Sequence, residues 1–68
     1  AEFIPSEGSK VTQKPVKDLG LPVGMTIGGL VRDGVGLLVS GNTMIQPGDS
    51  VMVFCHNVNM KKIEKFFL

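Results

Sequence analysis

Two turn motifs divide the middle of this chain into short apolar strands, and they restrict its fold more than any other feature. Arg32-Asp33-Gly34 separates the apolar segments Met25 to Val31 and Val35 to Val39. Both central residues of a tight two-residue hairpin turn need positive φ, which Asp and Gly adopt at low cost. Pro47-Gly48-Asp49 supplies a second turn before the β-rich segment Val51 to Phe54. The sequence therefore predicts a hairpin followed by a further strand.

Two more segments carry helix signals. Proline is tolerated in the first turn of a helix and glycine commonly follows the last, so Pro15 to Leu19, followed by Gly20, predicts a short helix. The last segment opens at Asn57 or Asn59, since asparagine caps helices well. Its residues Met60, Ile63 and Phe67 follow helical spacing and predict one stripe facing the sheet.

The start of the chain, Glu2 to Ile4, is expected to form a short strand that ends at Pro5, because proline lacks a backbone donor. The pair Gly28-Gly29 weakens the first hairpin arm and indicates a bulge or a close contact there. These elements predict an α+β fold: a small, mostly antiparallel sheet of about four strands, in the order strand, helix, strand, strand, strand, helix, with two helices packed on it.

Length and composition limit the domain organisation. We expect residues 1–68 to be a single domain, and the start at Ala1 rather than methionine indicates a piece of a longer chain. A domain of this size buries only about 60% of its unfolded surface, so association with a partner copy is expected to help it. The formal net charge of +1 gives no steering toward nucleic acid. No apolar run approaches the ~20 residues of a membrane-spanning helix.

The residues that suggest site chemistry have simpler structural interpretations. Cys55 and His56 are the only cysteine and histidine, too few for a four-ligand structural zinc site, and we expect Cys55 to be a buried thiol. Gly34-Val35-Gly36 continues as a strand, whereas a dinucleotide fingerprint needs a helix there. No catalytic residues are predicted and the chain is not expected to be an enzyme. Arg32 and Asp49 are expected to stabilise turns, with anion recognition by Arg32 as the alternative.

Five motifs taken in order resemble the TrkA C-terminal domain, or RCK_C domain, of prokaryotic potassium-transport regulators. The resemblance covers nearly the whole chain, and the motifs are Leu19-Gly20-Leu21-Pro22, Val31-Arg32-Asp33-Gly34, Ser40-Gly41-Asn42-Thr43, Pro47-Gly48-Asp49 and Val51 to Phe54. It implies a cytoplasmic regulatory domain, peripheral to the inner face of the cell membrane through a potassium channel or transporter subunit. Members of this family pair as homodimers. NAD or ATP would bind an upstream RCK_N domain, so no cofactor is expected in this segment.

Some members of the family bind cyclic di-AMP between two copies. The corresponding ligand surface here would comprise the residues after the first helix and at the start of the next strand: Leu21, Pro22, Val23, Thr26 and Ile27. Pro22 and Thr26 stand where such binders usually have a basic residue and a polar amide. Three functions therefore stay open: a ligand-sensing regulatory domain, a purely structural dimerisation module, and a cytoplasmic appendage of another ion or anion transporter.

Overall fold

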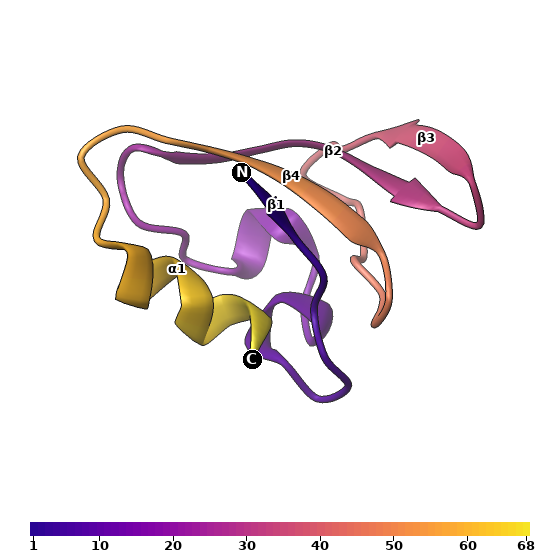
Figure 1. The fold of residues 1–68 in the computed structure, drawn as a ribbon, viewed down its shortest axis with the longest axis horizontal. Coiled ribbons are helices and arrows are strands. Elements are labelled where there is room, and N and C mark those ends of the chain that lie inside the picture. The colour runs from indigo at the N-terminus through magenta and orange to yellow at the C-terminus, as the bar shows by residue number, and fades with distance from the viewer.

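The chain folds around one antiparallel sheet, and the computed structural model describes all residues, 1–68 (Figure 1). The sheet order is β1-β4-β2-β3. Its strands are β1 (Glu2–Phe3), β2 (Met25–Arg32), β3 (Val35–Leu38) and β4 (Ser50–Cys55), and the helical elements are the 3-10 turns η1 (Lys10–Thr12) and η2 (Val16–Asp18) and the α-helix α1 (Met60–Phe67). The α+β class and the four-stranded antiparallel sheet are confirmed.

The turn chemistry expected between the strands is present. Asp33 and Gly34 have φ of 51° and 77°, as a two-residue hairpin turn requires, and β2 and β3 pair on either side of them. Gly48 has φ of 87°, and the Asp49 N–H donates to the Gln46 carbonyl at 3.1 Å. Proline at the second position of that turn and glycine at the third are the residues this geometry favours.

β2 and β4 form the centre of the sheet, and a bulge interrupts their pairing. Ile27 pairs with Val53 and Gly29 with Met52, so Gly28 is the extra residue. A Cβ on Gly28 would lie 2.5 Å from a ring carbon of Phe54, which leaves room only for glycine unless the ring moves. The bulge and the close contact expected at Gly28-Gly29 therefore occur together.

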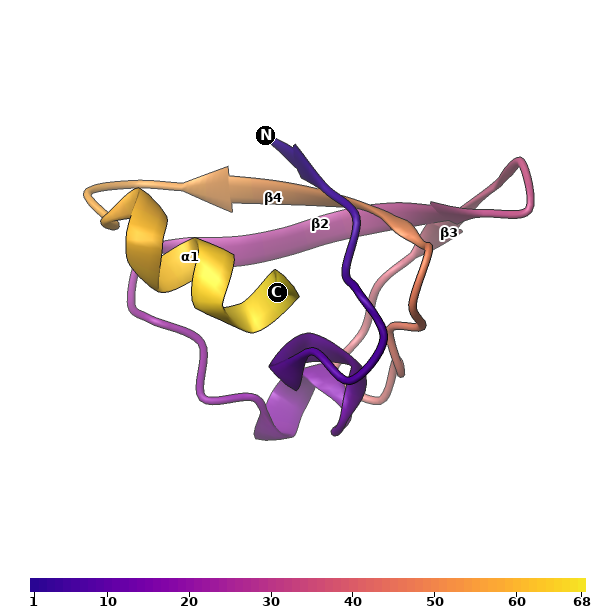
Figure 2. The same ribbon diagram turned by 60° about the horizontal axis from the view of Figure 1, so that its bottom comes forward.

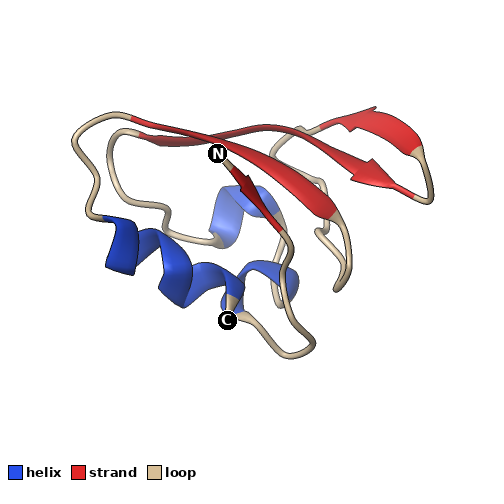
Figure 3. Cartoon of the chain, in the orientation of Figure 1, coloured by secondary structure: helices blue, strands red, loops and turns tan.

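One face of the sheet is covered and the other is open. Figures 2 and 3 show α1 and both 3-10 turns on the same side of the strands. Nine apolar side chains are buried between these layers: Val11, Met25, Ile27, Leu30, Ile45, Val51, Val53, Ile63 and Phe67. Alternate residues of a strand point to opposite faces, so the neighbours of these core residues in β2 and β4 lie on the uncovered side, which we call the outer face.

α1 begins where one of the two predicted caps lies. The Asn59 side chain accepts a hydrogen bond from the Lys61 N–H at 2.8 Å. Ile63 and Phe67 are buried, and the Phe67 ring stacks on Phe3 with centroids 4.9 Å apart. The predicted stripe is wrong at Met60, which is exposed because the first turn of α1 extends beyond the core.

The first predicted helix is a 3-10 turn rather than an α-helix. The Leu19 N–H donates to the Val16 carbonyl at 3.2 Å, an i to i+3 bond. Pro15, which has no N–H to donate, and Gly20, at φ of 65°, leave too few residues for a stable α-helix between them. None of the helical elements is long and apolar enough to cross a bilayer.

Candidate functional site

The five residues of the predicted ligand surface do not share one face. Val23 is fully exposed, Leu21 and Pro22 are half-buried, and Thr26 is exposed on β2. Ile27, the next residue, is 7% exposed and belongs to the core. Because neighbouring strand residues point to opposite faces, a ligand at Thr26 cannot also touch the Ile27 side chain without opening the core. The surface that remains accessible is the corner formed by Pro22 and Val23.

This corner is a tight turn fixed to the segment before α1. The Met25 N–H donates to the Pro22 carbonyl at 3.1 Å, and Gly24 takes φ of 91°. The Gly24 carbonyl accepts a bond from the His56 N–H at 2.8 Å. A Cβ on Gly24 would lie 2.2 Å from the His56 carbonyl oxygen, so only glycine fits here. The turn therefore presents Val23 to solvent at the tip of a well-defined backbone.

A shallow hollow of about 330 Å³ lies beside the corner. Its lining is mostly polar: Pro22, Val23, Asn57, Val58, Asn59 and Lys62. Lys62 is the single charged residue of this set, and the Asn59 side-chain oxygen is already used as the cap of α1. The hollow thus offers one cation and amide groups to a small polar or anionic ligand, with no carboxylate or nucleophile to catalyse a reaction.

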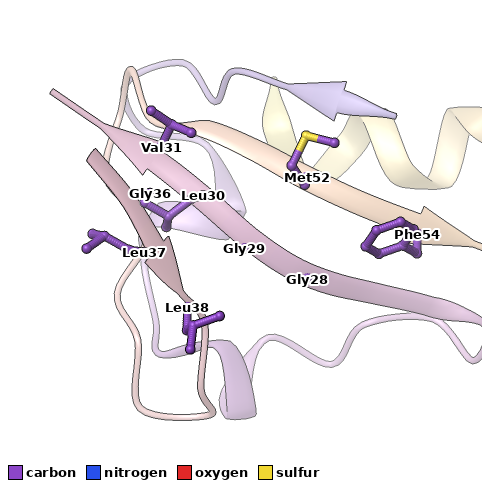
Figure 4. Close-up of a pocket in the computed structure, with 9 residues that line it drawn as sticks. All are labelled: Gly28, Gly29, Leu30, Val31, Gly36, Leu37, Leu38, Met52 and Phe54. Carbon is purple, nitrogen blue, oxygen red and sulfur yellow. The ribbon is translucent and has the colours of Figure 1, made fainter. Parts of the chain in front are cut away.

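A second hollow, of about 380 Å³, lies on the outer face (Figure 4). It is lined by Gly28, Gly29, Leu30, Val31, Gly36, Leu37, Leu38, Met52 and Phe54. The three glycines form its floor, and Figure 4 shows Leu38 and Phe54 on either side of Gly28 and Gly29. The sequence analysis did not single out this site. Its signal was present in β4, where both alternating sets of residues are apolar, a pattern typical of a strand buried on two faces.

Arg32 and Asp49 form the one ion pair of the chain. Arg32 Nε and Nη2 donate to the two Asp49 carboxylate oxygens at 2.9 and 2.7 Å, and Nη2 also donates to the Met44 carbonyl at 3.1 Å. The Gln46 N–H donates to the same carboxylate at 2.8 Å. These bonds tie β2 to the turn before β4. They confirm a structural role for both charges and commit Arg32 Nε and Nη2 to the fold.

The pair also shifts the ionisation of both groups. The hydrogen bond from Arg32, assisted by that from the Gln46 amide, holds the pKa of Asp49 below its ordinary value against the opposing effect of burial. The pKa of Arg32 is raised by the same bond to Asp49. Asp49 therefore stays ionised in the folded protein, although its side chain is only 3% exposed.

The prediction of a buried thiol is wrong. Cys55 is free and exposed: it is the last residue of β4, and the residues that follow it directly are also exposed. His56 is exposed beside it, and its Nε2 lies 3.3 Å from the Asn57 side-chain nitrogen. No three His, Cys, Asp or Glu side chains come together as a metal site requires.

Comparison with known proteins decides the family. The model of the TrkA-C domain matches residues 1–68. The chain belongs to the TrkA-C domain family. A "Trk system potassium uptake protein TrkA" from Azorhizobium caulinodans is 36% identical over 61 residues, which are 90% of this chain and 13% of that protein. A "Trk system potassium uptake protein TrkA homolog 1" from Methanosarcina mazei is 29% identical over 66 residues, 97% of this chain and 15% of that protein.

This TrkA-C domain matches only a small part of each relative. The chain spans about one seventh of the length of each of these two proteins. The motifs that suggested the family are now located in the structure: Asp33-Gly34 and Pro47-Gly48 form turns, and Arg32 and Asp49 bridge between them. The features that identify the TrkA-C domain are therefore those that hold its fold together.

Proposed function

We propose that this TrkA-C domain is a regulatory domain of a Trk-type potassium uptake protein and that it works as a homodimer. The match to the TrkA-C model over residues 1–68 carries this proposal, and the names of both relatives support the link to potassium uptake. In this proposal the domain lies in the cytoplasm and acts on a membrane potassium transporter through the rest of its protein. NAD or ATP would bind a separate upstream domain.

The distribution of polar groups supports a regulatory rather than a catalytic role. The most buried charge, Asp49, directs its hydrogen bonds to Arg32 and to the backbone of a turn. The two hollows described above contain no convergent acid, base and nucleophile. What the surface offers instead is two mostly polar hollows, one of them beside the Pro22 corner, and one apolar face, which suit binding.

The test uses the full-length protein that contains this domain. In a bacterial host that depends on it for potassium uptake, growth at limiting potassium and rubidium influx are measured with the domain intact, with residues 1–68 deleted, and with Asp33→Asn as a surface control. We expect deletion to abolish regulated uptake and the control to leave it unchanged. Unchanged influx after deletion, with the truncated protein present at normal abundance, would contradict the proposal.

Ligand sensing is the finer part of the proposal, and the polar hollow at Pro22 and Lys62 favours it over a purely structural dimerisation module. A ligand that binds only the native state raises the midpoint of thermal unfolding. We expect a nucleotide panel that includes cyclic di-AMP to contain one compound that raises this midpoint, and Lys62→Ala to reduce the increase. A flat response at saturating concentration would favour the structural dimerisation module.

A further inference from the structure

We propose that the hollow formed by η1, η2 and the segment that joins them binds a small phosphate ester with neighbouring hydroxyl groups. The hollow has a volume of about 260 Å³ and is lined by Lys10, Gln13, Lys14, Asp18 and Leu19. It shares no residue with the hollow beside the Pro22 corner, and both 3-10 turns lie on the covered side of the sheet (Figure 2). The inference goes beyond the proposed function and depends neither on potassium uptake nor on dimerisation.

The backbone that carries the lining side chains is held at both ends. In η1 the Gln13 N–H donates to the Lys10 carbonyl at 3.1 Å, and the fully buried Val11 side chain anchors this turn in the core. At the start of η2 the Val16 N–H donates to the Thr43 carbonyl at 3.0 Å, which ties the turn to a separate loop. A ligand therefore meets a preformed backbone, and less ordering opposes its binding.

The Gln13 side chain is also held in place. Its Nε2 donates to Thr12 Oγ1 at 3.0 Å and to the Ser9 carbonyl at 3.4 Å. With both hydrogens of the amide nitrogen directed to the protein, the amide oxygen is the group left for a ligand. This oxygen accepts hydrogen bonds, so it suits a hydroxyl group rather than a phosphate.

The charges of the hollow favour an anion. Lys10 and Lys14 bring two ammonium groups to it, and Asp18 brings one carboxylate. Neither lysine forms an ion pair with Asp18 or with any other residue, because the one ion pair of the chain joins Arg32 to Asp49. An anion that lies between the two ammonium groups reduces their mutual repulsion. Lysine binds phosphate as a point charge, which needs no fixed fork geometry.

Asp18 decides which kind of anion fits. A carboxylate repels a bare anion but accepts hydrogen bonds from hydroxyl groups, as the Gln13 amide oxygen does. The volume lies below the about 300 to 1,000 Å³ of sites for drug-sized ligands. No aromatic side chain lines the hollow, so it offers no platform for stacking a nucleobase. A phosphate on Lys10 and Lys14, with adjacent hydroxyls on Asp18, fits these groups better than inorganic phosphate or a nucleotide.

The test is an NMR titration of the 68-residue chain with glycerol 3-phosphate, which joins one phosphate to two neighbouring hydroxyls. Inorganic phosphate is the probe without hydroxyls. Ionic strength is kept constant with sodium chloride, because salt screens exposed charges. Lys10→Gln, Lys14→Gln and Asp18→Ala change the hollow, and Lys65→Gln removes the same charge from α1, outside every hollow. Circular dichroism melts confirm that each variant folds.

We expect the amide signals of residues 10–19 to shift with a dissociation constant of roughly 1 to 10 mM, and glycerol 3-phosphate to bind at least about threefold more tightly than inorganic phosphate. An exposed ion pair contributes up to about fivefold in affinity, so Lys10→Gln and Lys14→Gln should each weaken binding at least about threefold. Lys65→Gln should weaken it less than about 1.5-fold. Asp18→Ala should remove the preference for glycerol 3-phosphate without weakening inorganic phosphate, because it removes the hydroxyl acceptor and a repelling charge together.

Shifts spread over all the lysine-bearing segments, an equal loss with Lys65→Gln, or a preference that survives Asp18→Ala would overturn the inference. Glycerol phosphate occurs free and as the headgroup of phosphatidylglycerol. Vesicles of phosphatidylglycerol and phosphatidylcholine distinguish the two sources. Vesicle binding that Lys14→Gln and Asp18→Ala both weaken supports the site with a lipid headgroup as ligand, whereas binding of glycerol 3-phosphate without vesicle binding supports it with a free phosphate ester.

Discussion

Replacing Asp49 by asparagine tests the bonding network that joins β2 to the turn before β4. The substitution keeps the size of the side chain, so it creates no cavity. Asp49 Oδ1 accepts one bond from Arg32, and Oδ2 accepts one from Arg32 and one from the Gln46 N–H. An asparagine amide must place its NH₂ at one of these two positions. The NH₂ group therefore faces at least one N–H donor, and two donors cannot form a hydrogen bond with each other.

The loss of stability follows from the number of hydrogen bonds that the substitution changes. In the better orientation the amide nitrogen takes the Oδ1 position, one hydrogen bond is lost, and the other two lose the assistance of the carboxylate charge. Removing a partner from a buried hydrogen bond costs about 1 to 3 kcal/mol, and we expect Asp49→Asn to lower the free energy of unfolding by about 2 kcal/mol. For a domain of 60 to 100 residues this lowers the unfolding midpoint by about 8 to 16 °C.

The pH dependence gives a second readout. Because the pKa of Asp49 is lowered in the folded state, its carboxylate stabilises the protein fully above the unfolded-state pKa of about 3.9. This contribution is lost as the pH falls through the lower pKa of the folded state. We therefore expect the midpoint of the unsubstituted chain to fall more steeply with acid than that of Asp49→Asn, whose amide does not titrate.

Thermal and urea unfolding by circular dichroism at neutral and acidic pH measure both effects. Asp33→Asn is the matched control, since Asp33 is exposed at φ of 51°, a conformation that asparagine tolerates, and it should change stability by less than about 0.5 kcal/mol. Asp49→Asn with the stability of this control, or with an acid dependence as steep as that of the unsubstituted chain, would refute the reasoning.

Three further substitutions probe the turns and α1. Gly24→Ala should lower the free energy of unfolding in urea by more than about 2 kcal/mol, because its Cβ would lie 2.2 Å from the His56 carbonyl oxygen and its φ is strained for alanine. A loss below about 1 kcal/mol would contradict this. Gly28→Ala should change stability by less than about 1 kcal/mol while shifting the Phe54 ring signals in NMR spectra, since the exposed ring can turn away; global unfolding would contradict this. Asn59→Ala should cost about 1 kcal/mol and speed amide hydrogen exchange in the first turn of α1, and unchanged exchange would argue against the cap.

The parts of the fold that depend on local chemistry could be predicted from the sequence. The turns at Asp33-Gly34 and Pro47-Gly48 follow from which residues tolerate positive φ, and the Asn59 cap follows from one side-chain oxygen. The exposure of Met60 could not be predicted, since it depends on how far α1 extends past the sheet. The ion pair between Arg32 and Asp49 joins separate elements, so the sequence indicated the residues but not their pairing.

The candidate sites also combine features that follow from local sequence with features that depend on the arrangement of separate elements. The opposite orientation of Thr26 and Ile27 follows from the two-residue period of a strand and was available from the sequence, although a surface containing both was predicted. The outer face depends on a fact that only the structure supplies: α1 and both 3-10 turns cover the same side of the sheet. Once this arrangement is known, the apolar residues on the other side of β4 can be recognised as an uncovered surface.

The pairing of the first strand with the last has a consequence for how this domain is made. Glu2 pairs with Met52, and the Ser6 N–H donates to the Phe67 carbonyl at 3.0 Å, so early and late residues close the same core. Contacts between distant parts of a sequence form more slowly than local ones. During synthesis the strands are complete before α1 exists, and Ile63 and Phe67 arrive last. Until they do, the outer face and the part of the covered face under α1 are both exposed apolar surfaces, and the nascent domain is at its most prone to aggregate.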